Sequence, residues 1–235
     1  MRTRHGRYGR YGRWLSGVIL ALLTVLLVGC AGGQSANVSP TAPPIPTPTT
    51  QPTATAIPTV LYKADWATRA SEWKLPPHWR ISGGKLTNDG LGSAPLLVPY
   101  TITAPNYAIE LRAQAIAVPG TGGCGTYFGI GAQDATGKQL YLGDATCIFR
   151  DPPFHSDSDL VTTGDYPSGA IARENVMNTN PKTYTITVHG SNVVYSPGAV
   201  AIGGLTAPYP LAPAQPFIAD AGVQVVITSF TIWSI

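Results

Sequence analysis

Apolar and polar residues alternate with a period of two over much of the chain after residue 60. The segment 106–118 shows this most fully, with an apolar face made of Tyr107, Ile109, Leu111 and Ala113. Its opposite face consists of Ala108, Glu110, Arg112 and Gln114. Because successive side chains of a strand point to opposite sides, the pattern predicts a strand with one buried face.

The same period marks three further segments, and helical periodicity is hard to find. Residues 127–134 alternate Phe128, Ile130 and Ala132 with Tyr127, Gly129, Gly131 and Gln133. Residues 138–143 alternate Leu140 and Leu142 with Gln139 and Tyr141, and residues 183–189 alternate Tyr184, Ile186 and Val188 with threonines. Turn signals separate shorter candidates at 61–64, 79–82, 85–88, 96–102, 192–195, 199–203, 217–219 and 223–232. We predict an all-β domain over residues 60–235, with about a dozen strands in two antiparallel sheets packed face to face.

Several of these strands resemble one known family. The matching segments are Trp73, 79–87 (Trp-Arg-Ile-Ser-Gly-Gly-Lys-Leu-Thr), 96–100, 107–112, 184–194 and 222–233. Together they are similar to concanavalin A-like lectin and glucanase domains, and most similar to the keto-disaccharide hydrolase-like, laminin-G-like branch. The resemblance implies a jelly-roll β-sandwich whose last strand pairs near the first. It also implies that a concave sheet contacts carbohydrate.

The chain begins with a basic, then apolar, segment. Residues 1–13 contain five arginines and no acid, and an apolar run follows from Trp14 to Val28. This arrangement is typical of a secretory signal. Leu27-Val28-Gly29-Cys30 resembles the lipobox of bacterial lipoproteins, which implies a signal peptide over 1–29 and a diacylglyceryl group and fatty acyl chain (palmitate) on Cys30. The predicted location is the extracytoplasmic side of a bacterial membrane. The alternatives are a plain signal peptide or an uncut anchor.

Removal of the signal peptide changes the charge of the chain. The full sequence has 15 basic and 12 acidic residues, and five of the basic ones lie in the signal. The mature chain is therefore slightly acidic, and nothing in it indicates a nucleic-acid-binding surface. Residues 30–59 lack charge after Cys30 and are rich in Pro and Thr. We interpret them as an extended tether between lipid and sandwich.

Three cysteines occur in the sequence. If Cys30 carries lipid, Cys124 and Cys147 remain, and an even number outside the cytoplasm favours a disulfide. The two flank the hairpin predicted around Thr136-Gly137, so their strand ends come close together. The alternative is two buried free thiols.

Candidate binding residues lie on the polar faces of three predicted strands. Glu110, Arg112 and Gln114 share one face, and we expect Tyr127, Gln133 and Tyr141 to join them in one surface. Aromatic faces and planar amides or carboxylates are the groups that hold sugars in the resembled fold. The alternative is that Glu110 and Arg112 belong to a solvated face without a ligand.

Catalysis of glycoside hydrolysis requires two carboxylates at a set separation. The glucanase pattern Glu-x-Asp-x-x-Glu is absent. The catalytic candidates are Glu110, Asp134 and Asp144, of which the two aspartates flank one hairpin and are candidates for a shared cleft. Nucleophile-elbow, zinc-protease and phosphate-loop motifs are absent from the sequence.

The segment 149–181 is the longest without a clear strand pattern. Its Asp157, Asp159 and Asp165 offer hard oxygen ligands for Ca²⁺, although their spacing is not that of an EF-hand. The alternative is a solvated acidic loop, and no other cofactor is expected.

These features predict a lipid-anchored, extracytoplasmic β-sandwich that binds carbohydrate or another cell-surface ligand. Two alternatives stay open: a glycoside hydrolase that uses the same sheet, and a structural or protein-binding module without catalytic activity.

Overall fold

The computed structural model describes residues 57–92, 94–120, 122–149, 155–162, 179–198, 201 and 203–235. Within 155–162, it describes the side chains of Ser156 and Leu160 only. The predicted signal peptide, Cys30, nearly all of the tether and most of the strand predicted at 199–203 therefore lie outside the described residues. In the part of the chain that is described, no helix is long and apolar enough to span a membrane.

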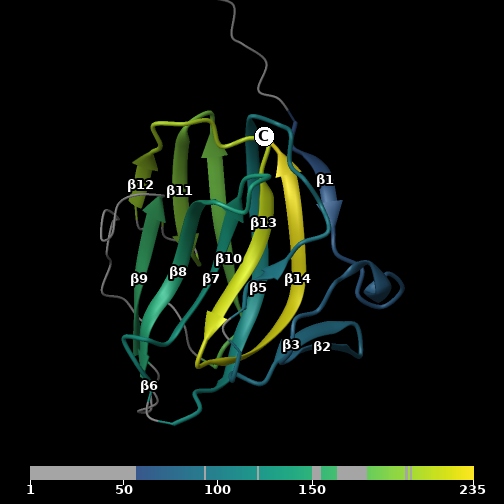
Figure 1. Cartoon of the computed structure of the whole chain (residues 1–235), viewed down its shortest axis with the longest axis vertical. Helices are drawn as coiled ribbons and strands as arrows, with labels where there is room; N and C mark the ends of the chain where they lie inside the picture. The colour runs from purple at the N-terminus through teal and green to yellow at the C-terminus, as the bar shows by residue number, and fades with distance from the viewer. Residues whose placement is uncertain are drawn as a thin grey trace, which may run out of the picture. The chain divides into compact units, whose positions relative to one another are not determined.

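The described strands form two antiparallel sheets that stack as two layers (Figure 1). Sheet A runs in the order β12 (Gly203–Thr206), β11 (Asn192–Pro197), β10 (Lys182–His189), β5 (Asn106–Ala117), β14 (Gln224–Ser234), β3 (Lys85–Asn88) and β2 (Trp79–Ser82), and β1 (Thr59–Lys63) pairs with β14. Sheet B runs in the order β4 (Leu96–Leu97), β13 (Gln215–Ala221), β7 (Tyr127–Gln133), β8 (Gln139–Phe149) and β6 (Gly122–Gly123), and β9 (His155–Thr162) pairs with β8. A single turn of 3-10 helix, η1 (Ala70–Glu72), follows β1. The predicted all-β, two-sheet fold is confirmed.

The alternating faces predicted from sequence are the faces that pack between the sheets. Ile109, Leu111, Ile130 and Ile186 are each fully buried. Phe128 of sheet B meets Tyr184 of sheet A edge to face, with ring centroids 5.7 Å apart. Aromatic pairs in this geometry add to the free energy gained by burial alone, so these contacts hold the two layers together.

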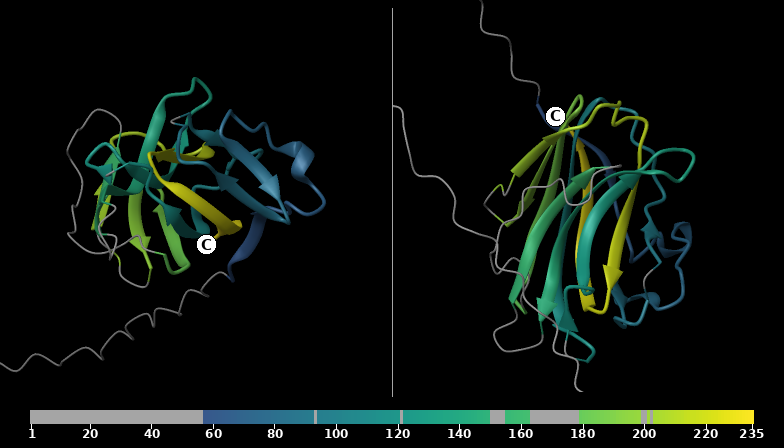
Figure 2. Two further views of the ribbon diagram at one scale, coloured as in Figure 1. Left: turned by 90° about the horizontal axis from the view of Figure 1, so that it is seen from below. Right: turned by 60° about the vertical axis from the view of Figure 1, so that its left-hand side comes forward.

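The last strand returns to the first, as the family resemblance implies. Strand β14 pairs with β1 through Thr59↔Ser234 and Val60↔Trp233, and with β5 along most of its length. The C-terminus consequently lies beside the start of β1 (Figure 1). Figure 2 shows the same two layers from below and from one side.

Several predicted strands have different bounds in the structure, and the physical reason is clear for two of them. The strand predicted at 96–102 is reduced to Leu96–Leu97, with an isolated bridge at Ile102↔Ala214. Pro99 has no N–H to donate, which interrupts the ladder. The strand predicted at 138–143 extends instead to Phe149, because β8 pairs with β7 on one side and with β9 on the other.

The prediction that 149–181 is one irregular stretch is wrong for His155–Thr162, which forms β9. Aspartate and serine have low strand propensity, so the sequence hides the period. Ser156 and Leu160 are nevertheless buried, at alternating strand positions. The long partner strand β8 supplies the pairing that the local sequence does not favour.

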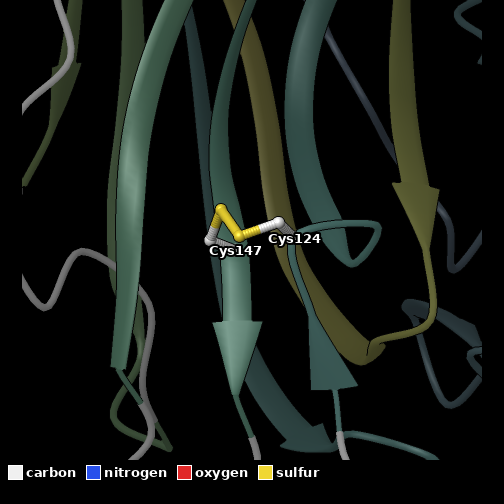
Figure 3. The surroundings of a disulfide bond; sticks show 2 residues. All are labelled: Cys124 and Cys147. Atoms are coloured by element: carbon white, nitrogen blue, oxygen red, sulfur yellow. A yellow bond between two sulfur atoms is a disulfide. The ribbon is translucent and has the colours of Figure 1, made fainter. Parts of the chain in front are cut away.

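The disulfide predicted between Cys124 and Cys147 is confirmed (Figure 3). It joins the turn after β6 to strand β8, across 23 residues of sequence. In the chain-entropy model, a crosslink closing a loop of this length stabilises the fold by about 3 kcal/mol.

Candidate functional site

The structure does not bring the predicted binding residues into one surface. Glu110, Arg112 and Gln114 lie on β5, on the outer face of sheet A, between buried apolar residues. Tyr127 and Gln133 lie on β7, on the outer face of sheet B. The two sets therefore face opposite sides of the sandwich. Alternation along β5 and β7 correctly separates inner from outer positions but does not say to which sheet a strand belongs.

Tyr141 lies in the core, and its predicted place on the polar outer face is wrong. Its side chain is fully buried, and its hydroxyl lies 3.1 Å from the hydroxyl of Tyr107, which in turn donates to the carbonyl of Leu211 at 3.0 Å. Burial raises the pKa of Tyr107 to about 12, so this hydroxyl stays protonated.

A β-bulge explains the misplacement of Tyr141. Gln133 pairs with Gln139 and Ala132 pairs with Tyr141, which leaves Leu140 as an extra residue on β8. An inserted residue reverses the alternation that follows it. Gln139 therefore keeps its predicted outward position, whereas Tyr141 turns inward and Leu142 turns outward.

The outer face of sheet B carries a hollow of about 250 Å³. We call it the sheet-B groove and define it by six side chains from three neighbouring strands: Tyr127, Gln133, Gln139, Leu142, Phe217 and Ala219. It combines two aromatic rings, two planar amides and aliphatic groups. None of the six carries a charge at neutral pH.

Two glycines form the floor of this face. Gly131 lies between Phe217 and Leu142 in the cross-strand register, and a Cβ added to it would lie 2.2 Å from Cζ of Phe217. A Cβ added to Gly129 would lie 2.5 Å from Cβ of Asp144. Because these positions lack side chains, Phe217 and Asp144 approach the backbone of β7 closely.

Asp144 is the catalytic candidate that lies on this face. It is 9% exposed and pairs across the strands with Gly129 and, on the other side, with Asp159 of β9. Burial, reinforced by the negative charges of Asp220 and Asp144, raises the pKa of Tyr127.

Asp134 belongs to the β7–β8 turn. Its Oδ1 accepts hydrogen bonds from the N–H of Thr136 (2.8 Å), the hydroxyl of Thr136 (2.6 Å) and the N–H of Lys138 (3.0 Å). The hydroxyl bond from Thr136 is the main cause of its lowered pKa. Asp134 lies five residues beyond the partner of Asp144 on β7, roughly 16 Å away at strand spacing. That separation exceeds the distance at which two carboxylates cleave a glycosidic bond, so the predicted shared cleft for Asp134 and Asp144 does not form.

The structure does not show the three candidate calcium ligands gathered in one site. Asp157 and Asp159 lie on β9, where their side chains are not described, and Asp165 lies outside the described residues. Among the residues that the structure does describe, no group of three or more His, Cys, Asp or Glu side chains is placed to hold a metal ion.

One buried acid was missed from the sequence. Asp220 is 1% exposed and accepts a hydrogen bond from Nδ2 of Asn88 at 2.6 Å. Burial raises its pKa to about 6. Asp220 and Ile218 are two residues apart on β13 and therefore point to the same side of the strand. The alternation of the sequence thus indicates that Asp220 faces inward. Asn88 also bonds the carbonyl of Val223 and the N–H of Val225, which makes the pair a polar link inside the sandwich.

No protein-family model matches the chain, and no curated protein sequence does either. Solved structures share its backbone arrangement. One is described by the phrase "prominent members of the human gut microbiota express endo-acting O-glycanases" (8% identity, TM-score 0.55, covering 75% of this chain and 100% of that one). Another is laminarinase from Flavobacterium sp. UMI-01 (12% identity, TM-score 0.53, 75% and 100%).

A third similar structure is the Crh5 transglycosylase in complex with NAG (16% identity, TM-score 0.52, 73% of this chain and 82% of that one). At these identities the likeness establishes the fold alone. The chain shares the two-sheet, jelly-roll type of β-sandwich with these structures, which is the fold class that the sequence predicted.

Proposed function

We propose that this protein binds carbohydrate through the sheet-B groove. The observation that carries the proposal is the pairing of Gln133 with Gln139 directly across β7 and β8, beside Phe217 and Tyr127 in one hollow. Each amide offers both donors and acceptors to hydroxyl groups, and aromatic and aliphatic surfaces suit the C–H faces of a sugar ring. Fold neighbours named as a laminarinase and as a transglycosylase in complex with NAG support this class of ligand.

Binding fits the groove better than hydrolysis does. The outward positions along β8 are Leu142, Asp144 and Thr146, which supply one carboxylate. Asp134 serves the turn, and Asp220 faces Asn88 inside the sandwich. A pair of carboxylates around a scissile bond is the usual requirement of a glycosidase.

Glycoside hydrolysis is the second candidate, and one observation favours it. The strand register places Asp159 of β9 directly opposite Asp144 of β8. Turnover of oligosaccharides that is abolished by Asp144→Asn, with binding retained, would establish this function instead.

We also propose that the sandwich lies outside the cytoplasm, held to a bacterial membrane by lipid on Cys30. Two features support it: the lipobox-like sequence ending at Cys30, and the Cys124–Cys147 disulfide, a bond typical of oxidising compartments. Labelling with a fatty-acid analogue tests the anchor. The label and the membrane association should both disappear in Cys30→Ser.

A glycan array probed with the full chain tests carbohydrate binding. We expect signal that falls sharply in the double variant Gln133→Ala/Gln139→Ala and persists in Gln114→Ala, a matched change on the other sheet. Absence of both binding and turnover would leave the structural or protein-binding module as the answer.

A further inference from the structure

A second hollow lies at the edge of sheet B. It has a volume of about 500 Å³, and we call it the edge pocket. Its walls come from the segment after η1, from the end of β4 and from the start of β13. They include Lys74, Leu75, Pro76, Leu97, Pro99 and Gln215.

The edge pocket and the sheet-B groove share a wall, because Pro95 lines both. The strand register also pairs residues of the edge pocket with residues of the sheet-B groove. Leu97 of the edge pocket pairs with Phe217 of the groove, and Gln215 of the edge pocket pairs with Gln133 of the groove. The two hollows are therefore neighbours along one line that crosses the strands from β8 to β4. Three strand spacings separate these strands, about 14 Å.

The outer end of this line is open. Strand β4 consists of Leu96–Leu97 alone, and Leu97 is 37% exposed. An edge strand this short leaves no wall of sheet beyond it, so a ligand that crosses β13 continues past the edge. A site with such an open end suits the interior of a chain better than its terminus.

The two hollows also differ in chemistry. The groove offers the amides of Gln133 and Gln139, whereas leucine and proline make up most of the edge pocket. One amide, Gln215, lies there, and its Nε2 donates to the carbonyl of Val98 at 3.2 Å. On the rim, Oε1 of Glu72 is paired with Arg69, and Lys74 is exposed. Apolar walls of this kind contact the C–H faces and acyl groups of sugars, and the amides orient the hydroxyls.

We propose that the edge pocket is a second subsite, so that the site holds an internal run of a glycan chain longer than a disaccharide, laid across the strands. This inference rests on the proposed function. It adds that the ligand is a polymer held along its length, with one part on the amides of β7 and β8 and another on the aliphatic wall after β4.

Calorimetric titration of the full chain with cello- and chito-oligosaccharides, from disaccharide to hexasaccharide, tests this. Affinity should rise with length beyond the disaccharide. Leu97→Ala should weaken binding of the longest oligomer about tenfold and weaken disaccharide binding much less. Lys74 lies outside both sheets, and Lys74→Ala should also weaken the binding of long oligomers. Ile116→Ala on sheet A is the matched control and should change neither.

Two outcomes overturn the inference while the proposed function stands: equal affinity for disaccharide and hexasaccharide, or an equal loss for both in Leu97→Ala. A complete lack of glycan binding by the unmodified chain would instead overturn the proposed function together with the inference.

Discussion

Asp220 in sheet B accepts a hydrogen bond from Asn88 in sheet A across 2.6 Å, and both side chains are 1% exposed. The bond links β13 to β3 through the interior of the sandwich. A buried polar link of this kind fixes the relative position of two layers, and it costs stability when its acid is charged.

The stability of the fold should fall as the pH rises from about 4 to about 6. Burial raises the pKa of Asp220 from 3.8 to about 6, so the folded state holds this proton more tightly than the unfolded state does. Protonated Asp220 therefore adds up to about 3 kcal/mol to the free energy of unfolding at pH values below its unfolded-state pKa. This contribution is lost as the pH rises through its folded-state pKa. Asp220→Asn should flatten this slope in denaturant titrations at several pH values. An unchanged slope in the variant would assign the effect to other groups.

Gly131→Ala should displace Phe217 from the floor of the sheet-B groove. The added Cβ would lie 2.2 Å from its Cζ and 2.7 Å from the carbonyl oxygen of Tyr141. Overpacking of this kind costs about 1–3 kcal/mol, and glycan binding should weaken as the ring moves. Gly125→Ala is the control, because nothing lies within 4 Å of the added atom. Equal melting temperatures for the two variants would contradict the described packing of Phe217.

Tyr141→Phe should lower stability without changing ligand binding. The variant loses one buried hydroxyl contact with Tyr107, worth about 1 kcal/mol, while Tyr107 keeps its bond to Leu211. Denaturant unfolding and glycan titration of the same sample separate the two effects. Weaker binding with unchanged stability would place Tyr141 in the site, as the sequence suggested.

Loss of the Cys124–Cys147 bond should cost about 3 kcal/mol in unfolding free energy. The paired variant Cys124→Ala/Cys147→Ala avoids leaving a free thiol, and reduction of the unmodified protein should produce a similar change. A thiol count of two in the oxidised, unfolded domain would show that the bridge does not form.

The fold was largely predictable, because alternation depends only on local sequence. Tyr107, Ile109 and Leu111 point inward as their period requires. The hairpin of β2 and β3 was also predicted to the residue, at Trp79–Ser82 and Lys85–Asn88. Burial of one strand face is a strong enough constraint to fix such elements from the local order of apolar and polar residues.

The site was less predictable for three physical reasons. Polar outer faces on β5 and β7 look alike in sequence, although they lie on opposite sides of the sandwich. The extra residue Leu140 reverses the faces of β8, and a bulge has no clear sequence signature there. Phe217 and Leu97 join the site only through pairing between strands that are far apart in the chain.

The most direct test of the central claim is an NMR titration of the full chain with a glycan that it binds, following backbone amide shifts residue by residue. The sheet-B account predicts shifts at Gln133, Gln139 and Gly131, with little change at Glu110, Arg112 and Gln114. Shifts concentrated on Glu110–Gln114 would contradict it and move the binding surface to sheet A.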